Sequence, residues 1–243
     1  GTHLFSKRFG DAAQQIATGA VIDANEKIFI TGGFNGSVNF GGANLTSAGA
    51  TDVYIAAFSS TGAHQWSQRY GNAVAQSATD IDVDGTGAVY ITGSFLGAID
   101  FGGGVLTSAG GNDQFVAKFD GAGAHAWSKH FGNAAEQLGQ SIAVTSTGAV
   151  FLTGAVAGSA DFGGGTLTSA GLDDISIARF DTSGAYGWAK LFGDAQGQSG
   201  QNIAVDSTGG VFVCGDFTGN VNFGTGAHTS AGSLDIFVAK LAQ

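Results

Sequence analysis

Polar side chains recur at fixed places in this chain and are the first candidates for chemistry. One set stands in short loops, at Asp11, Asn72, Asn133 and Asp194, and a second set precedes a Phe-Gly pair, at Asn39, Asp100, Asp161 and Asn222. A glutamine follows each member of the first set, at Gln15, Gln76, Gln137 and Gln198. Such groups predict up to four near-equivalent sites for a polar ligand such as a glycan. The alternative is structural, because Asp and Asn cap turns and Gln can bridge backbone groups between repeats.

A third set of carboxylates precedes a predicted strand in every repeat, at Asp52, Asp113, Asp174 and Asp235. We expect these groups mainly to cap turns. The segment Asp82-Val-Asp84-Gly-Thr is similar to a calcium-binding loop, since hard cations need several oxygen ligands. The pair of carboxylates is not repeated in the other three units, which favours a turn. The sequence therefore assigns no metal ligand.

Motifs of common catalytic and cofactor sites are not found in the sequence. Three of the five histidines, His3, His64 and His125, are repeat equivalents and cannot converge on one metal. Zinc-ligand spacing, a nucleophile elbow and a phosphate-binding loop are all missing. The glycine runs at 102–104 and 163–165 are expected in β-hairpins, which argues against dinucleotide binding. We predict no catalysis and no cofactor, although the narrow axis of a four-bladed ring leaves room for a cation.

These residues recur because the chain consists of four sequence repeats with an offset of 61 residues. The offset relates the segments 3–10, 64–71, 125–132 and 186–193. It also relates the Thr-Ser-Ala-Gly segments at 46–49, 107–110, 168–171 and 229–232. Strict spacing favours a propeller over a sandwich, and the lack of capping ends argues against a solenoid.

Each repeat predicts four short strands, which we name A to D. In the third repeat they cover 140–144, 149–153, 174–180 and 186–192, with a Gly-rich insert at 158–172 between B and C. Alternating apolar and polar residues bounded by Gly, Asp and Ser indicate strands and turns. Four antiparallel strands per repeat are the build of a propeller blade. We therefore predict an all-β fold, a four-bladed β-propeller in one domain (1–243), with repeats at about 3–63, 64–124, 125–185 and 186–243.

The ends of the sequence predict how the ring closes. The chain begins in a D strand, Leu4–Phe9, and stops after a C strand, Asp235–Leu241. We expect the first segment to complete the last blade, giving a monomeric ring with no free sheet edge. Because successive strands run antiparallel, the D–A and B–C connections share one face, which holds the twelve candidate ligand-binding residues. The tryptophans of strand D are expected to pack between blades, at Trp66, Trp127 and Trp188.

The composition narrows the partners of the protein. The 243 residues include 43 Gly and 19 Phe, only 12% are charged, and the net charge is −10. A Lys-poor acidic chain is unsuited to nucleic acid or anionic lipid, and no apolar run reaches the roughly 20 residues of a membrane helix. The single cysteine, Cys214, has no partner for a disulfide and leaves the compartment open. The Gly/Ser/Thr/Asn-rich composition favours an extracellular location.

The repeat resembles a known bacterial repeat. The resemblance lies in Gly-Ala-Val-Tyr-Ile-Thr-Gly-Ser-Phe at 87–95, Asp-Phe-Gly-Gly-Gly-x-Leu-Thr-Ser-Ala-Gly at 100–110, and Asp-x-Phe-Val-Ala-Lys-Phe-Asp at 113–120 followed by Trp127. These segments are similar to the SBBP β-propeller repeats of large secreted or surface proteins, notably of myxobacteria and Bacteroidetes. The resemblance implies a propeller outside the cell or on the bacterial surface, with an adhesion-like or scaffold role.

Three functions are compatible with these observations. The leading one is a secreted or surface binding and adhesion module for a glycan or an extracellular protein, in which fourfold display adds avidity to weak sites. The second is a ligand-free scaffold or spacer within a larger extracellular protein. The third is an extracellular glycosidase or lyase, which needs a converging acid–base pair, whereas the sequence offers symmetric carboxylates.

Overall fold

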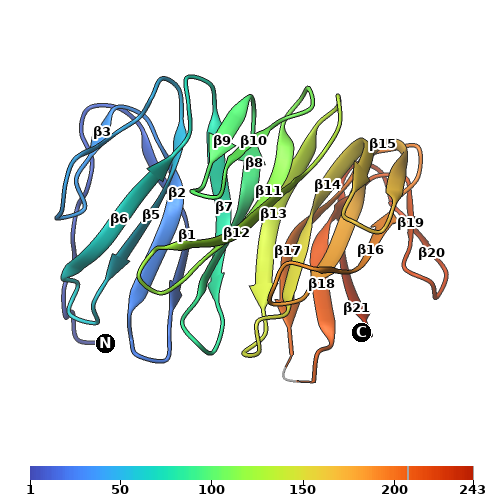
Figure 1. Cartoon of the computed structure of the whole chain (residues 1–243). Helices are drawn as coiled ribbons and strands as arrows, with labels where there is room; N and C mark the ends of the chain where they lie inside the picture. The colour runs from blue at the N-terminus through green and yellow to red at the C-terminus, as the bar shows by residue number, and fades with distance from the viewer. Residues whose placement is uncertain (207, 243) are drawn as a thin grey trace.

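The regular elements of the computed structural model are all β-strands, in line with the alternating sequence pattern. The structure describes residues 1–206 and 208–242, and the all-β class is confirmed for them. Within these residues, no helix is long and apolar enough to cross a membrane. Figure 1 shows the strands arranged as a row of sheets that follows the chain from one end to the other.

Strands A, B and C of each repeat form one main antiparallel sheet, which takes its strand D from the first residues of the next repeat, and we number these sheets one to four in chain order. The first contains β1 (Gln15–Ile22), β2 (Ile28–Phe34), β5 (Asp52–Phe58) and β6 (His64–Tyr70). The second contains β7 (Gln76–Val83), β8 (Val89–Phe95), β11 (Asp113–Phe119) and β12 (His125–Phe131). The third contains β13 (Gln137–Val144), β14 (Val150–Asp161), β15 (Thr166–Phe180) and β16 (Tyr186–Phe192). The fourth has three strands, β17 (Gln198–Val205), β18 (Val211–Phe217) and β21 (Asp235–Leu241).

The B–C inserts fold back as small hairpins. In three repeats the hairpin is a separate two-stranded sheet, formed by β3 (Ser37–Val38) with β4 (Leu45–Thr46), β9 (Ala98–Asp100) with β10 (Val105–Thr107), and β19 (Asn220–Asn222) with β20 (Ala227–Thr229). In the third repeat the same segment continues β14 and β15 past the main sheet. The hairpins explain why these repeats are longer than a usual propeller blade.

A β-bulge in strand A recurs in every repeat. The register of pairing with strand B shifts after Ala17, Ala78, Gly139 and Gly200. Opposite the bulge, strand B carries glycine at Gly32, Gly93, Gly154 and Gly215, where a methyl group would collide with a strand A carbonyl oxygen. Glycine is therefore required by the close approach of the two backbones.

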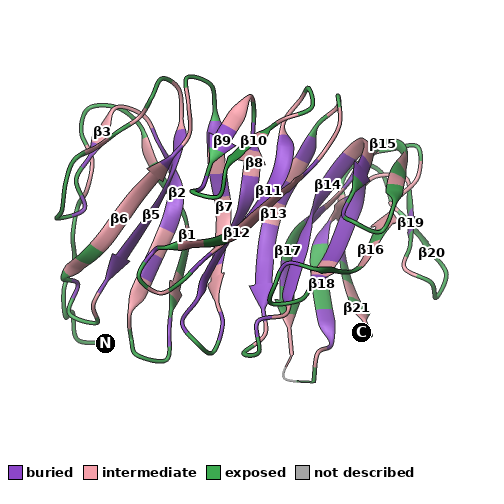
Figure 2. Ribbon diagram, in the orientation of Figure 1, coloured by how far each residue is buried: buried purple, intermediate pink, exposed green. Residues whose placement is uncertain are grey.

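Aromatic side chains of strand D pack onto the next sheet along the chain. The ring of Tyr70 lies 5.1 Å from Phe101 and 5.4 Å from Phe119, both in the second repeat. The indole of Trp66 lies 6.1 Å from Phe29 and donates its Nε1–H to the Gly121 carbonyl at 3.2 Å. The expected packing of tryptophan between sheets is confirmed. Figure 2 shows buried residues concentrated along the middle of the row.

The predicted closure of the ring is not formed within this chain. Residues 1–14 form no strand and lie beside the first sheet, with the ring of Phe9 5.1 Å from Phe40 and 5.4 Å from Phe58. The fourth sheet ends at β21, and Figure 1 shows the two termini at opposite ends of the row. The inner strands contact one another in the order β1, β7, β13 and β17. The first and fourth sheets lie at opposite ends of this row, so the segment 3–9 does not reach the β21 edge.

Candidate functional site

The D–A loops and B–C inserts lie together on one face, as predicted. We call this the loop-rich face; it consists of residues 10–14, 71–75, 132–136 and 193–197 with 35–51, 96–112, 157–173 and 218–234. Backbone hydrogen bonds join the two kinds of loop, for example from Leu96 N–H to the Ala75 carbonyl at 3.1 Å and from Ala157 N–H to the Glu136 carbonyl at 2.9 Å. The face is therefore a set of braced loops.

The four glutamines brace these loops from inside. We expected these glutamines in the D–A loops, but they are the first residues of strand A. The side chains of Gln76, Gln137 and Gln198 are at most 1% exposed. The Gln76 amide donates to Asn72 Oδ1 at 2.7 Å and to the Leu96 carbonyl at 3.0 Å, and it accepts from Asn72 N–H at 3.0 Å. Gln137 and Gln198 repeat this pattern, and Gln15 repeats the two donated bonds. Their amide groups are used within the fold.

The partner of each glutamine caps the D–A loop. The Oδ1 atoms of these residues accept backbone N–H bonds of 2.7 to 2.9 Å, from Ala13 to Asp11, Val74 to Asn72, Ala135 to Asn133, and Gln196 to Asp194. Asp11 and Asp194 also accept N–H bonds from the insert, from Ser37 and Asn220. The hydrogen bonds from Ala13 and Gln196 contribute most to lowering the pKa of these two carboxyls. Both are held ionised at neutral pH.

The candidate residues that precede the Phe-Gly pairs are the most accessible. Asn39, Asp100, Asp161 and Asn222 are exposed at the tips of the hairpins. Their Oδ1 atoms accept N–H bonds of 2.7 to 2.8 Å, from Gly41, Gly102, Gly163 and Gly224. The Oδ2 atoms of Asp100 and Asp161 make no hydrogen bond with the described residues. One oxygen thus fixes the turn while the other faces outward.

An aromatic ring lies against this glycine turn in three repeats. The rings of His64, His125 and Tyr186 cover Gly42, Gly103 and Gly164, where a methyl group would collide with the ring. The His125 Nε2 lies 3.1 Å from Ser128 Oγ, and the Tyr186 hydroxyl accepts the Ala189 N–H at 3.0 Å. We call each turn with its ring a ring–turn unit: 39–42 with His64, 100–104 with His125, and 161–165 with Tyr186.

The second ring–turn unit borders a hollow of about 480 Å³. The hollow is lined by Gly103, Gly104, Val105, Leu106, His125, Ala126, Trp127 and Ser128. The sequence identified His64 and His125 as repeat equivalents but did not reveal their contact with the glycine turns. The shared offset of Gly42 and His64, Gly103 and His125, and Gly164 and Tyr186 was a usable signal.

The carboxylates before strand C cap the inserts as expected, and they also reach a basic side chain that sequence reasoning missed. They accept N–H bonds from Ala48, Ala109, Ala170 and Ala231. Asp52 pairs with Arg69, and Asp113 Oδ2 lies 3.0 Å from His130 Nδ1. In the third repeat the basic position is Leu191, and burial is the main cause that raises the pKa of Asp174. The aligned column Arg8, Arg69, His130 and Leu191 was the missed signal.

The suspected calcium loop is a turn. Asp84 Oδ1 accepts N–H bonds from Thr86 at 2.8 Å and Ala88 at 3.1 Å, and its Oδ2 accepts the Tyr90 hydroxyl at 2.9 Å. Asp82 instead joins two sheets by accepting the Val144 N–H at 2.6 Å. Across residues 1–206 and 208–242, no three His, Cys, Asp or Glu side chains gather as metal ligands.

Antiparallel sheets packed in a row are consistent with β-propeller repeats, and such a repeat indicates a binding or scaffold module. A family model described as SBBP, the beta-propeller repeat, matches residues 187–223. Residues 187–223 are thus similar to an SBBP-type β-propeller repeat, and the offset of 61 residues relates this segment to 4–40, 65–101 and 126–162. The resemblance seen in the sequence is confirmed. A search of curated proteins finds no match to the chain.

Proposed function

We propose that this chain is a non-catalytic binding and adhesion module outside the cell or on the bacterial surface, with a glycan or a surface protein as its ligand. The observation that carries the proposal is the ring–turn unit, in which a ring covers a glycine turn capped by Asn or Asp, in three repeats. Each unit offers an aromatic ring beside exposed polar groups, and the second borders a hollow. Rings and a few placed polar groups are what a polar ligand such as a sugar requires.

The first three sheets present these units one after another along one molecule. Single shallow sites of this kind bind weakly, but several on one rigid body engage a repetitive surface with avidity. The braced loops support this role, because a preorganised site loses little entropy on binding. The two carboxylates of the ring–turn units, Asp100 and Asp161, lie in different repeats, and this separation supports binding over a converging acid–base pair.

The test removes the outward carboxylates without removing the turn. Asp100→Asn with Asp161→Asn keeps the turn cap, because Asn39 and Asn222 perform the same task in the first and fourth repeats. The control is Asp120→Asn with Asp181→Asn, which changes two capping carboxylates in C–D turns on the opposite face. On a glycan array and on intact bacterial cells, we expect the first variant to bind at least 10-fold more weakly and the control to bind normally. Equal binding by both variants, or no binding by the unmodified chain, contradicts the proposal.

A ligand-free scaffold is the second candidate. The specific observation in its favour is that the buried glutamines and the loop-capping Asp and Asn groups direct their hydrogen bonds into the fold. Absence of any glycan or surface-protein binding, together with a folded chain, would select this function.

A further inference from the structure

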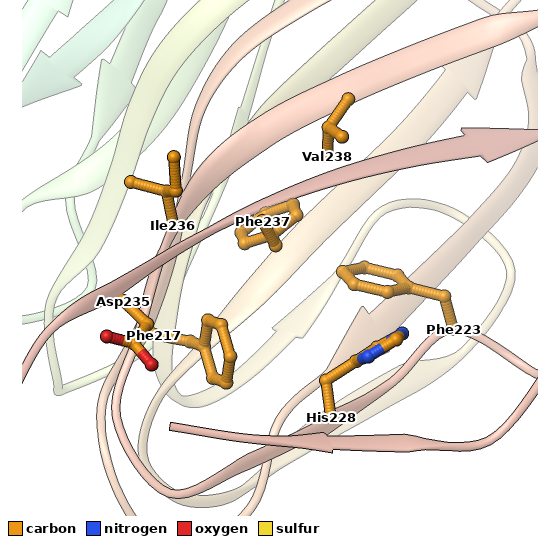
Figure 3. Close-up of a pocket in the computed structure, with 7 residues that line it drawn as sticks. All are labelled: Phe217, Phe223, His228, Asp235, Ile236, Phe237 and Val238. Carbon is orange, nitrogen blue, oxygen red and sulfur yellow. The ribbon is translucent and has the colours of Figure 1, made fainter. Parts of the chain in front are cut away.

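The fourth sheet exposes an apolar edge and an apolar face. In the other three sheets the equivalent edge and face are covered. Ile236 is 89% exposed and Val238 79%, whereas their equivalents in the first sheet, Val53 and Ile55, are 0% exposed. Figure 3 shows Ile236 and Val238 on one side of β21, with the rings of Phe217 and Phe223 on the other side. Beside this edge lies a hollow of about 420 Å³. In the first three sheets the same place holds strand D.

The first sheet carries the complementary feature. The segment 3–9 repeats the sequence of strand D and already lies where the strand D of a preceding blade would lie. Phe9 is 5.1 and 5.4 Å from Phe40 and Phe58, the same distances that separate Tyr70 from Phe101 and Phe119. Two other side chains of this segment also occupy the positions of their strand D equivalents. Phe5 and Lys7 lie beside Gly62 as Trp66 and Gln68 lie beside Gly123.

We propose that two copies of this chain associate head to tail, with segment 3–9 of one copy serving as strand D of the fourth sheet of the other. The internal pairing of β15 with β16 fixes the register. Shifted by one repeat, it pairs Ile236 with Phe9, Phe237 with Arg8, and Val238 with Lys7. The added strand satisfies the free backbone groups of the β21 edge, as in other cases of strand addition.

Charge and aromatic packing are complementary at this seam. Asp235 occupies the position of Asp52, and Arg8 occupies that of its partner Arg69. In one copy alone, Asp235 and Arg8 lie at opposite ends of the row. Phe212 is exposed, whereas its equivalent Phe29 is covered by Trp66. Phe5 is the repeat equivalent of Trp66, so the second copy supplies both the cation and the aromatic cover.

The seam differs from the internal interfaces at one position. The glycine under His64 and His125 is replaced by Thr225, whose Cβ would collide with a ring placed as in those two units. The ring of His3 must therefore turn outward. The fourth repeat consequently lacks a ring–turn unit of the same form.

The number of copies follows from comparing the number of sheets in one chain with the usual number of blades in a propeller. Propellers have about 4 to 8 blades. One chain supplies four sheets but leaves its ends apart, two chains supply eight, and three chains exceed this range. A head-to-tail contact forms a closed ring when its rotation closes, and two identical seams close the eight-bladed ring.

The first experiment measures molar mass by light scattering and sedimentation. The unmodified chain is expected to have the mass of two chains, and Ile236→Lys with Val238→Lys the mass of one. Both side chains are exposed in the single copy, so the substitutions leave its fold intact, which circular dichroism checks. The control is Val105→Lys, which is 64% exposed on a hairpin away from the seam and should remain a pair. We expect the dissociation constant to rise at least 100-fold in the double variant only.

The second experiment identifies the strand. In a Cys214→Ser background, Lys7→Cys in one tagged chain and Val238→Cys in another are mixed and oxidised. The proposal expects a disulfide between the two different chains, and less of it with Lys7→Cys against Val105→Cys. A chain that stays single at all concentrations overturns the proposal. Crosslinking only within one chain that carries both Lys7→Cys and Val238→Cys also overturns it. The same holds if Ile236→Lys with Val238→Lys leaves the mass of two chains unchanged, or if more than two chains assemble.

Discussion

At the scale of single residues, the repeated polar side chains divide by what their atoms contact. The buried glutamines donate amide hydrogen bonds to the loops. Asp100 and Asp161 instead use one carboxylate oxygen to cap a turn and leave the other without a hydrogen bond to the described residues. The position paired with the strand C carboxylate differs most between repeats. Arg69 pairs with Asp52, while Leu191 leaves the buried Asp174 without a cation. The third repeat therefore carries an uncompensated carboxylate.

Restoring the missing cation should stabilise the third sheet. We expect Leu191→Arg to raise the free energy of unfolding at pH 7 by about 1–2 kcal/mol, the range of a hydrogen bond to a charged group. Leu191→Gln is the control for side-chain length without charge. Urea unfolding of both variants and the unmodified chain measures the difference. An arginine variant no more stable than the glutamine variant would refute the ion-pair argument.

The gain should depend on pH in a defined direction. In the unmodified chain burial raises the pKa of Asp174, so ionisation costs stability as the pH rises through that folded-state value. In the arginine variant the nearby cation favours the ionised carboxylate and therefore opposes the effect of burial on the pKa of Asp174. The stabilisation by the ion pair is present where this carboxylate is ionised and is lost as acid protonates it. A gain at pH 3 equal to that at pH 7 would contradict this assignment.

At the scale of elements, each sheet depends on the bulge in strand A and the glycine opposite it. The bulge brings the Ser77 carbonyl against Gly93, and the same contact recurs with Ile16, Leu138 and Ser199 in the other sheets. After the bulge, strand A side chains shift by one position relative to strand B. The glycine therefore sets the register of the whole inner strand.

A methyl group at this glycine should be poorly tolerated. We expect Gly93→Ala to lower the free energy of unfolding by about 2–3 kcal/mol, because the backbones must separate to admit it. The matched control is Gly197→Ala, where a methyl group meets nothing within 4 Å. Thermal unfolding of the two variants gives the comparison. Equal melting temperatures of the two variants would show that the bulge can accommodate a methyl group at Gly93, and would contradict this argument.

The sequence predicted most strands of each sheet correctly, but it predicted where the strands begin and end less accurately. The period-2 pattern located strands B, C and D, since alternation and turn residues are local signals. It missed the first residues of strand A, because Gln76 and Gln137 resemble loop residues until their buried amides are seen to meet the insert. It likewise missed the pair of Asp52 and Arg69, whose members are separated by the length of strands C and D.

At the scale of the whole molecule, the repeats predicted four sheets, but the predicted closure within one chain is wrong. Leu4–Phe9 has the sequence pattern of strand D but forms no strand in this chain, and the pattern cannot say which β21 edge it would join. The contacts of Phe9 are equally suited to a strand from the same chain or from another copy. The distance between the first and fourth sheets decides against the same chain. Closure depends on the curvature of the stack, which no local pattern encodes.

The most direct measurement is backbone hydrogen exchange in β21 compared with β15, its equivalent in a complete sheet. In the paired chain the account predicts slow exchange in both strands. In the Ile236→Lys, Val238→Lys chain it predicts slow exchange in 175–180 and fast exchange at the edge amides of 236–241. Slow exchange of β21 in that single chain would contradict the account, because it would place a fourth strand on this edge without a second copy.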